Sequence, residues 1–123
     1  MYAPARSLID KGAVVTLAPD FNAGSHLCFS MQMAGSLGVL TLQMKPEEVI
    51  TATTLHGAYA LGVSQKSGSI HPGKQADLIL LEGKDYRETF YYFETPRSLR
   101  AFLFALSRKA FPSFKTSRAE AAV

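Results

Sequence analysis

Apolar residues fall into short runs along the chain, and their spacing predicts alternating strands and helices. The run at residues 13–17 is apolar and rich in β-branched side chains, which predicts a short buried strand. A similar run at residues 78–81 predicts a second strand. Helices are expected over residues 3–11, 27–42, 45–52 and 55–61. The aromatic stretch 86–93 is typical of a strand or an extended segment. The order of strand, loop and helix indicates an α/β fold.

Two helix starts carry local signals. Pro46 suits a first helical turn because that position needs no backbone donor. Glu47 and Glu48 follow it, and their carboxylates suit the positive end of a helix. Thr54 is expected to cap the next helix with its side chain.

The composition is that of a folded domain of ordinary size. The chain has 123 residues, of which 47% are hydrophobic and 19% charged, and this excludes a disordered protein. The single cysteine, Cys28, excludes an internal disulfide and a cysteine-based zinc cluster. The first residues hold no apolar signal-peptide core, and no apolar run approaches the roughly 20 residues that span a bilayer. We therefore expect a cytoplasmic protein without membrane partners.

The excess of positive charge comes entirely from one end of the chain. Residues 1–93 hold seven Lys/Arg and eight Asp/Glu, a net charge of −1, and residues 94–123 hold six Lys/Arg and two Asp/Glu, a net charge of +4. Nucleic-acid binding by the body of the chain therefore has no electrostatic support. The basic, Phe-containing end could be an arm for a membrane or a nucleic acid, but a non-native or disordered end is favoured.

Candidate chemistry gathers where the first predicted strand ends. Asp20 follows the strand, and the carboxyl end of a strand is where α/β enzymes present reactive groups. Its carboxylate could bind a metal or accept a proton. Asn22, Gly24 and Ser25 add an amide, an unhindered backbone and a hydroxyl, which together suit a polar small molecule.

Each of these residues also has a structural interpretation. Asp20, Asn22 and Ser25 are common turn formers, and Asp20 could equally cap the following helix. Cys28 has no basic neighbour in sequence, which favours a buried structural thiol over a nucleophile. Structural or surface roles are also favoured for the three histidines, His26, His56 and His71.

Four motifs resemble the amidohydrolase superfamily and, within it, the imidazolonepropionase family. Residues 68–81 read GSIHPGKQADLILL, similar to a turn and return strand that many amidohydrolases share. Three further stretches resemble imidazolonepropionases more closely: LAPDFNAGS at 17–25, MKPEEVITATTLHGAYALG at 44–62 and DYRETFYYF at 85–93. The resemblance covers roughly residues 3–93.

The resemblance implies the carboxyl-terminal portion of a metal-dependent (β/α)8 barrel, with part of a small β-sandwich appendage. The reaction it implies is hydrolysis of the cyclic amide C–N bond of 4-imidazolone-5-propanoate to N-formimino-L-glutamate, in histidine degradation. Asp20 matches the family's catalytic aspartate, which binds one divalent metal, zinc or iron. Asn22, Gly24 and Ser25 match positions that hold the substrate. The implied partner is a small molecule, and a homodimer is compatible with the full-length family.

The chain also departs from the family pattern. Pro19 stands where Thr or Ser is usual, and Ala23 stands where Pro is usual. The family's metal site needs a His-x-His pair and a further His, and this chain has no His-x-His. We therefore expect the isolated chain to be inactive and of low stability. These departures are typical of a gene fragment.

The expected organisation is barrel elements over 1–66, appendage over 67–93 and a divergent basic tail over 94–123. Two alternative functions stay open: a non-catalytic remnant or module that needs another chain, and another cyclic amidohydrolase subfamily. The motif at 85–93 speaks against the second of these.

Overall fold

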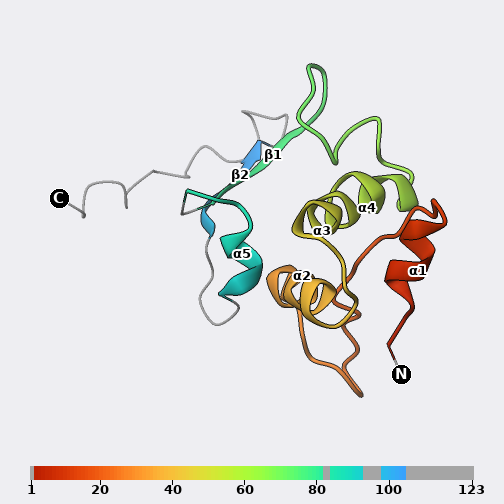
Figure 1. Ribbon diagram of the computed structural model, residues 1–123. Coiled ribbons are helices and arrows are strands. Elements are labelled where there is room, and N and C mark those ends of the chain that lie inside the picture. Colours follow the sequence, from red (N-terminus) through yellow and green to blue (C-terminus); the bar gives the residue numbers. More distant parts are fainter. Residues whose placement is uncertain (1, 82–83, 93–97, 105–123) are drawn as a thin grey trace.

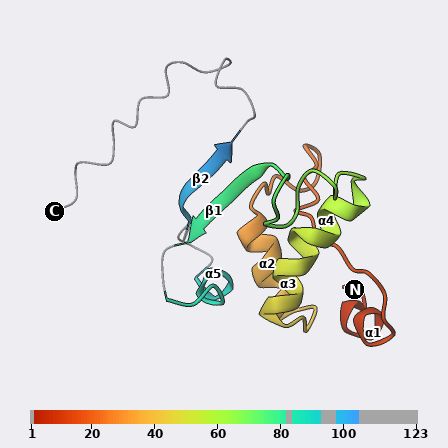
Figure 2. The ribbon, with the colours of Figure 1, turned by 90° about the horizontal axis from the view of Figure 1, so that it is seen from above.

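The computed structural model describes residues 2–81, 84–92 and 98–104. The helices and strands follow in the order α1 (Ala5–Asp10), α2 (Met31–Leu40), α3 (Pro46–Thr53), α4 (Leu55–Ala60), β1 (Ala76–Leu81), α5 (Glu88–Tyr91) and β2 (Ser98–Phe104). Helices α2, α3 and α4 form the centre, with α1 on one side and the two-stranded β1–β2 sheet on the other (Figures 1 and 2). In the described residues no helix is long and apolar enough to cross a membrane.

The local signal at Pro46 is confirmed, because α3 begins at that residue. Glu48 closes the first turn, and its Oε2 accepts a hydrogen bond from the Lys45 backbone N–H at 2.8 Å. Helix α2 is shorter than expected and begins at Met31. Ser30 determines this start, since its hydroxyl accepts a hydrogen bond from the Met33 N–H at 3.1 Å.

The expected side-chain cap at Thr54 is wrong. This residue precedes α4, but its Oγ1 donates a hydrogen bond to the Ile50 carbonyl at 2.6 Å and makes no cap. A threonine that directly follows one helix can satisfy that helix's last carbonyls instead of capping the next. Thr54 thus stabilises the end of α3.

The core lies between α2, α3 and α5, and Ala5 of α1 extends it on the other side of α3. Val49 is fully buried, and Ala5, Met44, Ala52 and Phe90 are nearly so. Six partly buried apolar side chains pack around this cluster: Ile9, Val15, Leu17, Val39, Leu42 and Ile50. The core is small, since only these few side chains hold the helices of the described chain together.

Two glycines of α2 allow its close packing. A Cβ atom at Gly35 would lie 2.5 Å from Cε1 of Phe90 and 3.1 Å from Cγ1 of Val49. A Cβ atom at Gly38 would lie 3.0 Å from Cδ1 of Leu17. Helix α2 therefore packs more closely against its neighbours than a residue with a Cβ atom at Gly35 or Gly38 would allow.

The prediction of a strand at residues 13–17 is wrong, because this segment has no partner strand in the described residues. It instead runs as an unpaired chain against α3 and α4. The Leu17 N–H and the Thr16 hydroxyl both donate to the Ala52 carbonyl, at 3.3 and 3.0 Å. A β-branched, apolar sequence favours extended backbone, but a strand also needs a neighbour for its ladder.

The second predicted strand is confirmed as β1. It pairs antiparallel with β2, from Ala76 opposite Phe104 to Leu81 opposite Ser98, with an irregularity between Leu80 and Leu81. Strand β2 lies in the segment 94–123, for which the sequence favours a disordered end, so the backbone over Ser98–Phe104 differs from that expectation. The rest of that segment lies outside the described residues, and the division into 1–66, 67–93 and 94–123 stays a prediction.

The expectation of a strand or an extended segment at 86–93 is also wrong, because the described part contains helix α5. Asp85 begins a turn there, with its Oδ1 accepting the Arg87 N–H at 2.9 Å. Burial of Phe90 against α2 then favours the helical turn over an extended segment.

Candidate functional site

Asp20 stands at the end of the unpaired segment, where the chain turns toward α2. Its backbone has φ of 53°, in the left-handed region that aspartate tolerates better than most residues. The residue is exposed. Its carboxylate is therefore open to solvent rather than buried in the core, as a reactive group at a segment end requires.

The three predicted ligand-binding residues lie together in one turn just after Asp20. Backbone hydrogen bonds of 2.8 Å run in both directions between Asn22 and His26. The Asn22 Oδ1 accepts the Gly24 N–H, also at 2.8 Å. The Ser25 N–H donates to the Asn22 carbonyl at 3.3 Å.

These bonds decide which donors the turn offers. Asn22 and the Gly24 N–H already satisfy each other in an Asx turn. The amide nitrogen of Asn22 and the hydroxyl of exposed Ser25 have no hydrogen bond within the described residues. The three residues lie in one loop, as the sequence predicts. The Gly24 N–H, however, is bound within the turn and is not free for a ligand.

Two aromatic rings close the base of this loop. The rings of Phe21 and Phe29 stack with their centroids 4.0 Å apart and their planes inclined by 17°. Both side chains remain largely exposed, at 44% and 73%. The stacked pair joins the two ends of the loop and holds the turn between them as one unit.

The residues present do not fit a metal centre. No group of three or more His, Cys, Asp or Glu side chains comes together in the described part of the chain. His26 lies in the exposed loop and His71 is exposed in a later turn. His56 is occupied elsewhere, since its Nδ1–H donates to the Val15 carbonyl at 2.8 Å. One exposed carboxylate is too few, because a zinc site needs about four ligands.

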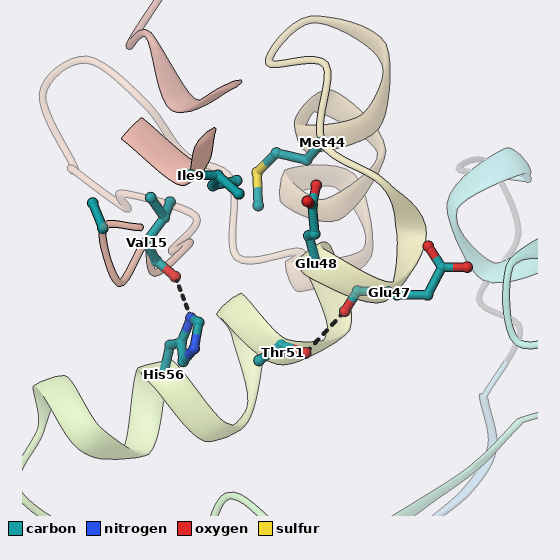
Figure 3. Close-up of a pocket in the computed structure, with 8 residues that line it drawn as sticks. Ile9, Val15, Met44, Glu47, Glu48, Thr51 and His56 are labelled. Atoms are coloured by element: carbon teal, nitrogen blue, oxygen red, sulfur yellow. Dashed lines mark hydrogen bonds between the residues drawn. The ribbon is translucent and has the colours of Figure 1, made fainter. Parts of the chain in front are cut away.

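A cavity of about 210 Å³ lies on a different side of the molecule, between α1, α3 and α4 (Figure 3). Its wall is mainly apolar, with Ile9, Val15 and Met44 around His56. None of the predicted site residues lines it. In Figure 3 the His56 ring turns toward the Val15 carbonyl, which supports the structural role expected of this histidine.

An ion pair beside this cavity connects two helices. Arg6 donates to both carboxylate oxygens of Glu48, at 2.8 and 3.1 Å, and joins α1 to α3. The guanidinium holds the pKa of the Glu48 carboxyl below its ordinary value. Sequence inspection missed this pair because the two residues are 42 positions apart and neither lies in a motif.

An open hollow of about 530 Å³ lies beside residues 16–18, just before Asp20. Its wall includes Met31 and Leu61, and Asp77 contributes a carboxylate from β1. Lys74 does not reach this hollow, since its Nζ donates to the Ser64 carbonyl at 2.6 Å and fixes its own turn.

Cys28 is half-buried rather than fully buried as expected.

This chain is similar to known amidohydrolases. The model of the amidohydrolase family matches residues 1–108. An imidazolonepropionase of Deinococcus radiodurans is 45% identical over 89 residues, which are 72% of this chain and 22% of that protein. The corresponding protein of Parabacteroides distasonis is 45% identical over 91 residues, 74% of this chain and 22% of its own length.

A more distant imidazolonepropionase, from Streptococcus pyogenes serotype M1, is 38% identical over 94 residues, 76% of this chain and again 22% of that protein. The chain therefore spans about a fifth of the length of the curated relatives it matches.

Proposed function

The chain belongs to the amidohydrolase family, and we propose that it supplies the carboxyl-terminal part of an imidazolonepropionase-type hydrolase. The reaction is hydrolysis of the cyclic amide C–N bond of 4-imidazolone-5-propanoate, which gives N-formimino-L-glutamate in histidine degradation. The observation that carries this proposal is the 38–45% identity to imidazolonepropionases over about three quarters of the chain. The substrate is a small molecule, and the compartment is the cytoplasm.

The proposed fold of the complete assembly is a (β/α)8 barrel with a small β appendage. Residues 13–17 would form the last barrel strand once a neighbour pairs with them. Their extended course and the helices that follow support this assignment. Residues 67–93, which include β1, would contribute to the appendage.

We assign Asp20 as the catalytic carboxylate, which takes a proton from the attacking water and passes it to the leaving nitrogen. Its exposure at the segment end supports this role. Asn22 and Ser25 would hold the substrate through the amide nitrogen and the hydroxyl that the turn leaves free. Gly24 would permit a close approach of the substrate to the backbone.

Amidohydrolases are generally metal-dependent. In the complete protein, Asp20 would be one ligand of a zinc or iron ion. Because the described residues do not complete a metal site, the isolated chain is expected to be inactive. The same observation favours a second candidate function, a non-catalytic remnant or a module that acts only with another chain.

A chimera tests the proposed function directly. Residues 3–93 of this chain replace the matching fifth of the Deinococcus radiodurans imidazolonepropionase. Hydrolysis of 4-imidazolone-5-propanoate by the chimera is the expected result. A folded chimera that lacks this activity, or one that hydrolyses dihydroorotate instead, would contradict the proposal.

A further inference from the structure

The stacked rings of Phe21 and Phe29 connect the loop after Asp20 to the helix that follows it. Phe29 directly precedes Ser30, whose hydroxyl caps the first turn of α2. Phe21 directly follows Asp20. Because the ring centroids lie 4.0 Å apart, the stack links the residue next to the proposed catalytic carboxylate to the start of a helix that packs in the core.

The hydrogen bonds of the loop do not make this link. Over residues 21–28, every hydrogen bond between described residues begins and ends inside the turn, from Asn22 to Gly24, Ser25 or His26. These bonds shape the turn but do not tie it to α2 or to another helix. The ring stack therefore supplies a restraint on the turn that its hydrogen bonds do not.

The exposure of the two rings indicates that they contribute little to the core. Phe21 is 44% exposed and Phe29 is 73% exposed, and neither belongs to the buried cluster around Val49. The free energy of burial scales with the apolar area removed from water, so rings this exposed gain less from it than core residues do. Contact between stacked rings contributes beyond burial, and here it acts on the loop.

The backbone of Asp20 gives this restraint a consequence at the candidate site. Its φ of 53° is left-handed, a conformation that aspartate tolerates but that an unrestrained loop would exchange with ordinary ones. The stack limits rotation at Phe21, the next residue along the chain. It thereby limits how far the Asp20 carboxylate can turn relative to the side chain of Asn22.

We propose that Phe21 and Phe29 are positioning residues, which hold Asp20 and the turn at residues 22–25 in the relative placement that receives the substrate. This inference rests on the proposed function. The rings act through the backbone and take no part in proton transfer. Without the stack, the substrate would have to order the loop as it binds, which costs binding free energy. The loss is therefore expected in KM, with a smaller change in kcat.

Amide hydrogen exchange in the full chain tests the restraint. Phe29→Ala removes one ring of the stack. Tyr91→Ala is the matched control, because Tyr91 is 77% exposed and its ring contacts that of Tyr92 edge to face, with the centroids 5.0 Å apart. Phe29→Ala is expected to speed exchange at the Gly24 and His26 amides about two- to tenfold, at an unchanged urea midpoint.

The control should leave exchange at the turn unchanged. Unchanged exchange in Phe29→Ala, or equal acceleration by Phe29→Ala and Tyr91→Ala, would overturn the proposal.

Kinetics of the chimera test the role in substrate binding. In the chimera with the Deinococcus radiodurans imidazolonepropionase, Phe29→Ala should raise KM for 4-imidazolone-5-propanoate about two- to tenfold and change kcat less than about twofold. Phe29→Tyr keeps an aromatic ring and should restore KM. The proposal is wrong if KM is unchanged in Phe29→Ala, or if it is as high in Phe29→Tyr as in the alanine variant.

The two measurements separate this proposal from the proposed function. Faster exchange at the turn together with an unchanged KM would refute the positioning role and leave the proposed function standing. A folded chimera that does not hydrolyse 4-imidazolone-5-propanoate, even with Phe29 intact, would count against the proposed function. Exchange in the full chain would then decide alone whether the rings hold the turn.

Discussion

The close approach of α2 to α5 makes a quantitative prediction at Gly35. In Gly35→Ala the new Cβ would lie 2.5 Å from Cε1 and 2.7 Å from Cδ1 of Phe90, so the ring must move. Overpacking of this kind costs about 1–3 kcal/mol, and the better helix propensity of alanine offsets about 1 kcal/mol. We expect the free energy of unfolding to fall by up to about 2 kcal/mol, measured by urea denaturation.

Gly57 in α4 provides the matched control. A Cβ atom there would lie 3.6 Å from the Ala52 carbonyl oxygen and 3.7 Å from the Thr16 hydroxyl, which are ordinary contacts. Gly57→Ala should therefore stabilise the chain, by about 0.5–1 kcal/mol. In a Phe90→Ala background the clash with the ring disappears and only the tight 3.1 Å contact with Cγ1 of Val49 remains, so Gly35→Ala should become less destabilising. Stabilisation by Gly35→Ala in the parent chain would refute this account of the packing.

Three further results are expected. Arg6 holds the pKa of Glu48 below its ordinary value of 4.5, so the pair stabilises the fold above that pH and this contribution is lost as the pH falls through the lowered value. Urea titrations between about pH 6 and pH 3 should show a shallower loss of stability in Glu48→Gln, and an unchanged slope would count against the pair. Asn22→Ala should speed amide hydrogen exchange at Gly24, whose N–H donates to the Asn22 side chain, whereas Ser25→Ala should not. Elemental analysis of the isolated chain after dialysis against zinc or iron should find no stoichiometric ion. One tightly bound ion per chain would contradict the conclusion that the described residues do not complete a metal site.

The local signal at the start of α3 was predictive because it acts within one turn. Pro46 and Glu48 fix the start of α3 through neighbours in sequence. The extended segment at 13–17 could not become a strand by its own sequence, since a ladder requires a second chain segment. Helix α5 was missed because its helical turn depends on the packing of Phe90 against α2, a contact between distant residues.

In the candidate site, too, local features could be predicted from the sequence and contacts between distant residues could not. Asn22, Gly24 and Ser25 are close in sequence, so their gathering in one turn could be predicted. That the turn uses the Gly24 N–H itself could not be predicted, because it depends on the rotamer of Asn22. The Arg6–Glu48 pair links two helices across 42 positions, and no local sequence pattern indicates it.

The central claim is that Asp20 provides the proton-transferring carboxylate of an imidazolonepropionase-type hydrolase. The most direct measurement is kcat of the chimera with 4-imidazolone-5-propanoate after Asp20→Asn, beside Asp10→Asn as the exposed control in α1. Since positioned acid–base groups contribute about a hundredfold or more, Asp20→Asn should lower kcat at least that much while Asp10→Asn leaves it unchanged. Equal activity of the two variants would contradict the claim.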